Sequence, residues 1–152
     1  AHIASLAFES IFRTTGKNSF SGFSSAAVRA RLKQALRLAT LLHDVGHGPL
    51  SHTTEEVMPK LKTLGVEVYK NRRDDVPFPK TLDDPERQAN HEDYTIKFIT
   101  DSSLTAVLKD SFSDIAPIHI ACLIDKTLKC PDDFFVDKGV DYRSILSQLV
   151  SS

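Results

Sequence analysis

Several features that would assign a class at once are missing from these 152 residues. There is no apolar stretch of about 18 residues and no basic-then-apolar leader, so we expect neither a membrane span nor a secretory signal. Lys and Arg number 19 against 20 Asp and Glu, so the near-neutral net charge excludes an overall field that would attract nucleic acid or an anionic membrane. Cys122 and Cys130 are the only cysteines, and the apolar surroundings of Cys122 favour a reduced thiol over a structural disulfide. These absences predict a cytoplasmic protein.

Alternation of apolar and polar residues, which marks a half-buried strand, is also nearly absent. Apolar residues instead recur at helical spacing, and 41% hydrophobic content at this length is enough for one buried core. The pattern predicts a single all-α domain of short helices joined by irregular loops. We expect helices over residues 2–14, 25–44, 51–65, 91–101, 103–112, 114–126 and from about 141 onward.

Capping residues and helix breakers set the limits of these helices. A serine at 24–25 is the expected N-cap of the second helix, and Asn90 is the expected N-cap of the fourth. Gly65 should close the third helix, which Pro59 should kink. The segment 66–90 has three prolines and dense mixed charge, so we expect a long surface loop there.

The segment 41–52, LLHDVGHGPLSH, gathers three histidines, an aspartate, two glycines and a proline behind an apolar run. Adjacent side chains project about 100° apart on a helix, so His43 and Asp44 can converge on one metal ion. An aspartate at a helix C-terminus opposes the macrodipole and is stabilised by a cation. Half of a metal site and an ordinary helix-end aspartate both remain possible for this pair.

A rival interpretation of the same segment is a two-histidine zinc face, because His43 and His47 are four residues apart. Such a face needs a continuous helix. Gly46, Gly48 and Pro49 argue against it, since they would end the helix before His47 could stack one turn above His43. We therefore expect His47 to point elsewhere.

The segment 41–52 strongly resembles the HD-domain phosphohydrolases, in particular the SAM-and-HD-domain-like branch of dNTP triphosphohydrolases, whose motif is approximately HDxGHGPFSH. Leu50 replaces the aromatic residue of that motif. The resemblance extends to His2 in AHIAS, which matches the family's first histidine, and to His91 in NHEDYT, which matches its later HE motif. It implies that residues 1–152 form one HD-domain helical bundle.

The resemblance also implies a metal site. His2, His43 and Asp44 match three of the four family ligands, and imidazole ligands suit Mn, Fe, Co, Ni or Zn better than Mg. The family's fourth ligand is an aspartate in a motif that would follow a helix similar to residues 145–152. Asp141 precedes that helix and is a weak substitute. We therefore expect a fragment truncated at both ends, with weakened metal binding and an incomplete catalytic site.

The remaining motif residues match family positions that act on the substrate. The resemblance implies that His47 and His52 face the substrate phosphates and that His91 is the general acid, with Glu55 as its orienting carboxylate. An imidazole with a pKa near 6.5 can hold and release a proton at neutral pH. Simpler roles remain open for two of them: His52 as a helix-capping residue and Glu55 as a solvated carboxylate in a first helical turn.

Together these matches predict a phosphohydrolase that cleaves a deoxynucleoside triphosphate to deoxynucleoside and triphosphate, with a divalent metal cofactor and homo-oligomeric assembly. The alternative is a non-catalytic HD scaffold that senses nucleotides or binds nucleic acid, for which the sequence gives no specific support. Its candidate residues are basic: Lys70, Arg72 and Arg73 in the long loop, and Arg29, Arg31, Lys33 and Arg37 on a helix face. A solvated helix face also explains the second group.

His119, among Ile and Ala, is expected in the core or at an interface.

Overall fold

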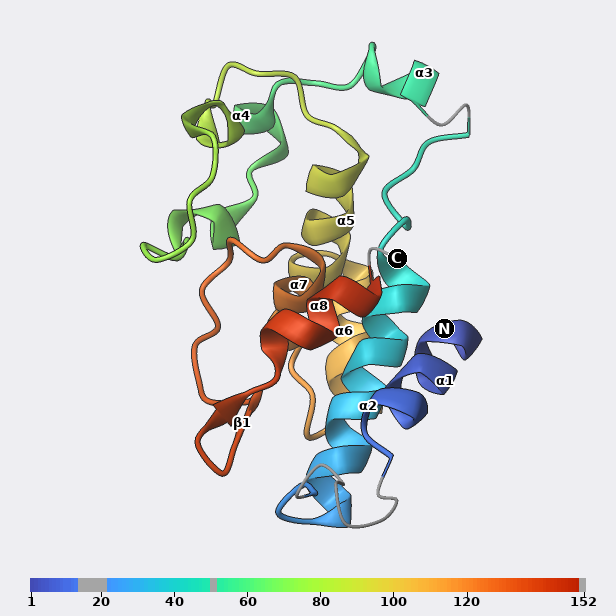
Figure 1. Cartoon of the computed structure of the whole chain (residues 1–152). Coiled ribbons are helices and arrows are strands. Elements are labelled where there is room, and N and C mark those ends of the chain that lie inside the picture. Colours follow the sequence, from blue (N-terminus) through green and yellow to red (C-terminus); the bar gives the residue numbers. More distant parts are fainter. Residues whose placement is uncertain (14–21, 50–51, 151–152) are drawn as a thin grey trace.

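The computed structural model describes residues 1–13, 22–49 and 52–150, and this part of the chain is mostly helical, as predicted (Figure 1). Its α-helices are α1 His2–Ile11, α2 Ala26–Leu42, α3 His52–Glu55, α4 Leu61–Leu64, α5 His91–Thr100, α6 Ser103–Ser111, α7 Pro117–Ile124 and α8 Arg143–Val150. The same residues also form two 3-10 helices and a hairpin: η1 Glu67–Lys70, η2 Lys80–Asp83, β1 Val136–Asp137 and β2 Val140–Asp141. None of the described helices is both long and apolar enough to cross a membrane.

The N-caps of α2 and α5 are those expected from the sequence. The hydroxyl of Ser25 accepts a hydrogen bond from the N–H of Val28 at 3.1 Å. Asn90 and Asp93 form a capping box, in which each side chain accepts the backbone N–H of the other residue, at 3.0 and 2.9 Å. Both caps satisfy amide groups that a helix N-terminus leaves without partners.

The core lies where α2, α5, α7 and α8 pack on one another, with α1 alongside α2 (Figure 1). Leu32 and Leu36 of α2, Ile96 of α5, Ile120 of α7 and Leu146 of α8 are all at most 1% exposed. The segment between α2 and α5, including α3 and α4, projects beyond this bundle (Figure 1). The C-terminal end of α2 and the start of α5 are thereby the anchors of that segment.

One continuous third helix was expected, and this prediction is wrong, because α3 and α4 are separate single turns. Between them a turn at residues 56–57 is followed by paired chain: Lys60 forms a β-bridge with Gln88, and the carbonyl of Pro59 accepts the N–H of Ala89 at 2.9 Å. Proline has no N–H to donate to a helix, so this pairing replaces the helical hydrogen bonds there. Gly65 does close α4, in the left-handed region with φ +62°.

The segment 66–90 is held to the bundle by a buried cation. The side chain of Arg72 is 5% exposed and forms ion pairs with Asp83 at 2.5 Å and with Asp125, just after α7, at 2.9 Å. Arg72 also forms a β-bridge with Leu128. The expected long loop is therefore tied to the C-terminal end of α7. It also contains the two short 3-10 helices η1 and η2.

A hairpin precedes the last helix, and the sequence pattern did not indicate it. Lys138 and Gly139 form its two-residue turn with φ +50° and +77°, as in turns that match the strand twist. Asp141 ends β2 and accepts the N–H of Arg143 at 2.8 Å, so its carboxylate caps the start of α8. The last helix therefore begins at Arg143, two residues later than expected.

Candidate functional site

The C-terminal end of α2 turns sharply after Leu42. His43 is its C-cap, and the N–H of His47 donates to the carbonyl of Asp44 at 3.1 Å in a following turn. His43 and His47 therefore do not share a helix, which rules out the two-histidine zinc face. The Nδ1 of His43 lies 3.1 Å from the carbonyl of Thr40 and donates to it, so in the neutral ring the lone pair is on Nε2.

Asp44 lies between two imidazoles. One carboxylate oxygen is 3.1 Å from Nε2 of His43, and the other is 3.6 Å from Nε2 of His47. A lone-pair nitrogen and a carboxylate oxygen at this separation repel each other unless a proton or a cation lies between them. The Asp44 side chain is 57% exposed, so an ion can reach it from solvent.

His91, the first residue of α5, completes a cluster with Asp44 and His47, and we call these three residues the Asp44 cluster. Each offers a ligand atom within 4.8 Å of the others. The rings of His47 and His91 stack with centroids 3.7 Å apart and planes at 13°. Nδ1 of His91 forms a hydrogen bond with Glu55 of α3, whose carboxylate also accepts the His91 backbone N–H at 3.4 Å.

The close approach of α5 to the turn after α2 depends on Gly46. A β-carbon at Gly46 would lie 2.0 Å from the carbonyl oxygen of His91 and 2.5 Å from the nitrogen of Thr95. The buried hydroxyl of Thr95 accepts the N–H of Gly46 and donates to the carbonyl of His43, both at 3.0 Å. Gly46 was expected only to break the helix, and nothing in the sequence pattern pointed to Thr95.

The start of α5 is fixed from its other side by a buried ion pair that sequence analysis also missed. Arg87 binds both carboxylate oxygens of Asp93, at 2.6 and 2.7 Å, and Asp93 is 2% exposed. The hydroxyl of Tyr69 donates to the same carboxylate at 2.8 Å. Burial, with the Asp93 charge beside it, raises the pKa of Tyr69 well above its usual value, so it stays a donor. This network holds His91 in place.

The other predicted site residues lie apart from the Asp44 cluster or outside the description. His2 is exposed in the first turn of α1, whose start lies toward the C-terminal end of α2 (Figure 1). It belongs to neither group of potential metal ligands found among the described residues, and neither do His43 and Asp141. Leu50, and the side chain of His52, lie outside the described part of the chain.

The second of those groups, which we call the Cys130 cluster, contains His119, Cys130 and Asp132. His119 is 5% exposed, as expected for a core residue. Its ring stacks on Phe134 with centroids 3.8 Å apart, and its Nε2 lies 3.1 and 3.2 Å from the two oxygens of Asp132. This histidine is therefore buried with a carboxylate partner, which its apolar neighbours in sequence did not suggest.

Comparisons of the chain with family models, with curated proteins and with solved structures find no match. The chemistry of the Asp44 cluster must therefore be judged from its geometry. The two imidazoles of the cluster and the neighbouring His43 lie around one exposed carboxylate, and Nδ1 of His91 has a second carboxylate, Glu55, as its partner. Such a set can hold a divalent cation and can also transfer a proton.

Proposed function

We propose that the chain is an HD-domain metal-dependent phosphohydrolase that cleaves a deoxynucleoside triphosphate to deoxynucleoside and triphosphate. The observation that carries the proposal is the position of the Asp44 carboxylate between His43 and His47, with the His91–Glu55 pair beside it. The resemblance of residues 41–52 to the HD-domain motif supports the same conclusion and supplies the substrate class.

His43 and Asp44 are the proposed core of the metal site, and His2 is the third proposed ligand. The donor set fits a divalent ion, because neutral His43 has its lone pair on Nε2, which faces a carboxylate oxygen of Asp44. When bound, the ion would polarise phosphoryl oxygens and acidify a water molecule. His2 would have to come to this pair from the start of α1, which lies toward the same end of α2 (Figure 1).

His91 is the proposed general acid. Its Nδ1 is held by Glu55, so its Nε2 is the nitrogen that can carry a proton toward the leaving 5′-oxygen of the deoxynucleoside. The hydrogen bond to the Glu55 carboxylate fixes the orientation of the ring. His47, stacked on His91, is proposed to contact the substrate phosphates together with His52, which begins α3.

The proposal is tested by incubating the intact protein with dNTPs and Mn²⁺, and by following deoxynucleoside by chromatography and triphosphate by ³¹P NMR. We expect the two products in equal amounts, and no product from the double variant His43→Ala/Asp44→Ala. Release of monophosphate and pyrophosphate, or no turnover of any dNTP, would contradict the proposal.

The alternative of a nucleic-acid-binding scaffold has less support, because most of its candidate basic residues are paired. Lys70 binds Glu67, Arg72 binds Asp83 and Asp125, and Arg73 binds Asp75. On α2, Arg29 and Lys33 both bind Glu9 of α1, and Arg31 donates to the carbonyl of Phe134. Charges neutralised within the chain attract a phosphate backbone weakly.

A further inference from the structure

The Cys130 cluster has the composition of a metal site, but its hydrogen bonds indicate another chemistry. Nδ1 of His119 accepts the backbone N–H of Ala116 at 3.0 Å, so the ring proton of neutral His119 is on Nε2. Nε2 then donates to Asp132. A ring nitrogen that carries a proton offers no lone pair to a metal, so this cluster is a hydrogen-bonded chain that ends at the thiol of Cys130.

The two segments that carry the cysteines of the chain lie against each other at this place. Cys122 is buried on α7, and its sulfur contacts the carbonyl of Leu128 at 4.0 Å, two residues before Cys130. The neighbouring Cys130 thiol and burial raise the pKa of Cys122, and the neighbouring Cys122 lowers the pKa of Cys130, although burial and the Asp132 carboxylate act to raise it. Arg143 donates to the carbonyls of Cys122 and Leu128, at 3.0 and 2.7 Å, and so ties the two cysteine-bearing segments together.

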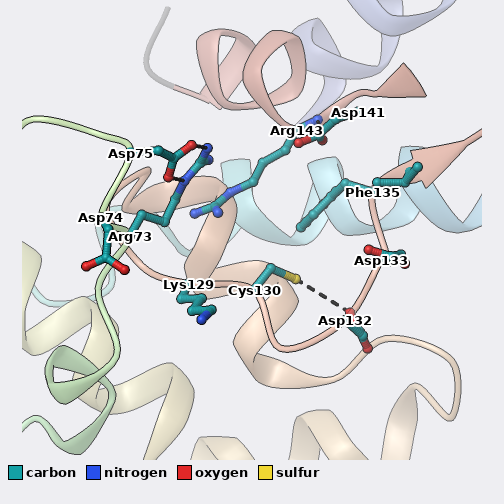
Figure 2. A pocket seen from close by; sticks show the side chains of 11 residues that line it. Arg73, Asp74, Asp75, Lys129, Cys130, Asp132, Asp133, Phe135, Asp141 and Arg143 are labelled. Atoms are coloured by element: carbon teal, nitrogen blue, oxygen red, sulfur yellow. Dashed lines mark hydrogen bonds and ion pairs between the residues drawn. The ribbon is translucent and has the colours of Figure 1, made fainter. Parts of the chain in front are cut away.

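Only one of the two thiols is accessible. Cys122 has no exposed surface, whereas Cys130 is half-buried and lines a cavity of about 410 Å³. Figure 2 shows the Cys130 sulfur on the cavity wall, directed toward Asp132, whose carboxylate lies 3.5 Å from it. The cavity is large enough to admit a small hydroperoxide. A partly exposed thiol on a cavity wall, with a buried second thiol on the adjoining segment, is the arrangement of a redox-sensitive cysteine.

We propose that Cys130 is a hydroperoxide-reactive thiol that forms a reversible disulfide with Cys122. The Cys130 thiolate attacks one oxygen of hydrogen peroxide, the O–O bond breaks, and hydroxide leaves with a proton from water, which gives a sulfenic acid. Cys122 then attacks the Cys130 sulfur, the S–O bond breaks, and its thiol proton leaves with the hydroxyl group as water. In total two thiols lose two electrons and two protons, and one peroxide becomes two waters.

The test is oxidation of the reduced, folded protein with hydrogen peroxide, followed by blocking of remaining thiols and peptide mapping by mass spectrometry. We expect the intact mass to fall by two hydrogens, a cross-linked pair of peptides containing Cys122 and Cys130, and full reversal by dithiothreitol. In Cys122→Ser, dimedone should trap the sulfenic acid on Cys130. In Cys130→Ser, Cys122 should stay reduced at the same peroxide concentration.

Three results would overturn the inference. One is a wild-type protein in which peroxide produces no link between the two cysteines. Another is oxidation of Cys122 in the Cys130→Ser variant at the wild-type rate of disulfide formation. The third is stoichiometric metal retained by the untreated protein and lost in Cys130→Ser, which would show a metal site instead. The wild-type mapping needs no variant, so the test stands even if a substitution impairs folding.

Discussion

The two imidazole clusters of this protein contain similar groups, but they present different atoms to a ligand. In the Asp44 cluster His91 is the first residue of α5, and Asn90 and Asp93 cap that helix, so the His91 ring takes no part in capping. In the Cys130 cluster His119 is the third residue of α7, and its ring accepts the amide of Ala116, whose own side chain cannot cap. The same residue type near a helix start can therefore be left available for chemistry or used by the helix itself.

This difference also explains why composition and proximity are insufficient to identify a metal site. Both clusters place potential ligand atoms within 4.8 Å of one another. Near the first, Nδ1 of His43 donates to the carbonyl of Thr40, so the neutral ring has its lone pair on Nε2, toward Asp44. In the second, His119 directs its proton toward the carboxylate of Asp132. Hydrogen-bond partners of the far ring nitrogen distinguish the two cases.

Replacement of the carboxylate, Asp44 in one cluster and Asp132 in the other, should give the largest difference in metal binding between the two clusters. We expect Asp44→Ala to lower metal affinity at least about 100-fold, because a direct ligand should matter no less than the groups that orient ligands. The matched variant Asp132→Ala should keep wild-type metal content. Inductively coupled plasma mass spectrometry of both proteins measures this, and equal metal content in the two variants would remove the distinction.

Replacement of a histidine in each cluster compares the two clusters by their effect on kcat. His91→Ala should retain metal and lose about 100- to 10,000-fold in kcat, the usual contribution of a general acid. Glu55→Gln should lose less, because the amide oxygen of glutamine can still accept a hydrogen bond from Nδ1 of His91. His119→Ala, in the other cluster, should keep its rate per folded molecule. A wild-type rate for His91→Ala would exclude His91 from the mechanism.

Gly46 provides a test of how the Asp44 cluster is assembled. Gly46→Ala would place a methyl group 2.0 Å from the carbonyl oxygen of His91, so we expect a loss of about 1–3 kcal/mol in the free energy of unfolding. Urea denaturation followed by circular dichroism measures the loss. The exposed Ser10→Ala on α1 should change stability by less than about 0.5 kcal/mol. A neutral Gly46→Ala would mean that α5 does not approach the turn this closely.

The smallest expected effect is a pH dependence at His119. Burial lowers the pKa of this ring, although Asp132 raises it, and the folded protein therefore binds its proton less readily than the unfolded chain. The unfolding free energy should fall as the pH drops below the unfolded value of about 6.5, and this loss should level off below the folded pKa. NMR titration of His119 should give a midpoint below that value, and a lower one still in Asp132→Asn. A midpoint above about 6.5 would contradict the burial of the ring.

Capping and helix-terminating residues in the sequence predicted the limits of three helices correctly. Ser25 and Asn90 cap the helices that were expected to start there, and Gly65 closes α4. The break between α3 and α4 was missed because it depends on pairing of Pro59 and Lys60 with the segment before α5, which is about 30 residues away in sequence. Long-range pairing of this kind leaves no periodic pattern in the sequence.

The candidate site was foreseen only in part. The contact between His91 and Glu55 was expected from the resemblance to HD-domain enzymes, and the structure brings these two side chains together. The position of His47 against both Asp44 and His91 was not expected, because the breakers after α2 indicated only that the helix ends there. The direction the chain takes next depends on Gly46 packing against α5, which cannot be judged from neighbouring residues.

Anomalous X-ray scattering from crystals of the intact protein grown with Mn²⁺ tests the central claim most directly. We predict one strong anomalous peak within coordination distance of Nε2 of His43 and a carboxylate oxygen of Asp44, and no peak at Cys130 and Asp132. A peak at the Cys130 cluster alone, or a protein that turns over dNTPs with no ion beside Asp44, would contradict it.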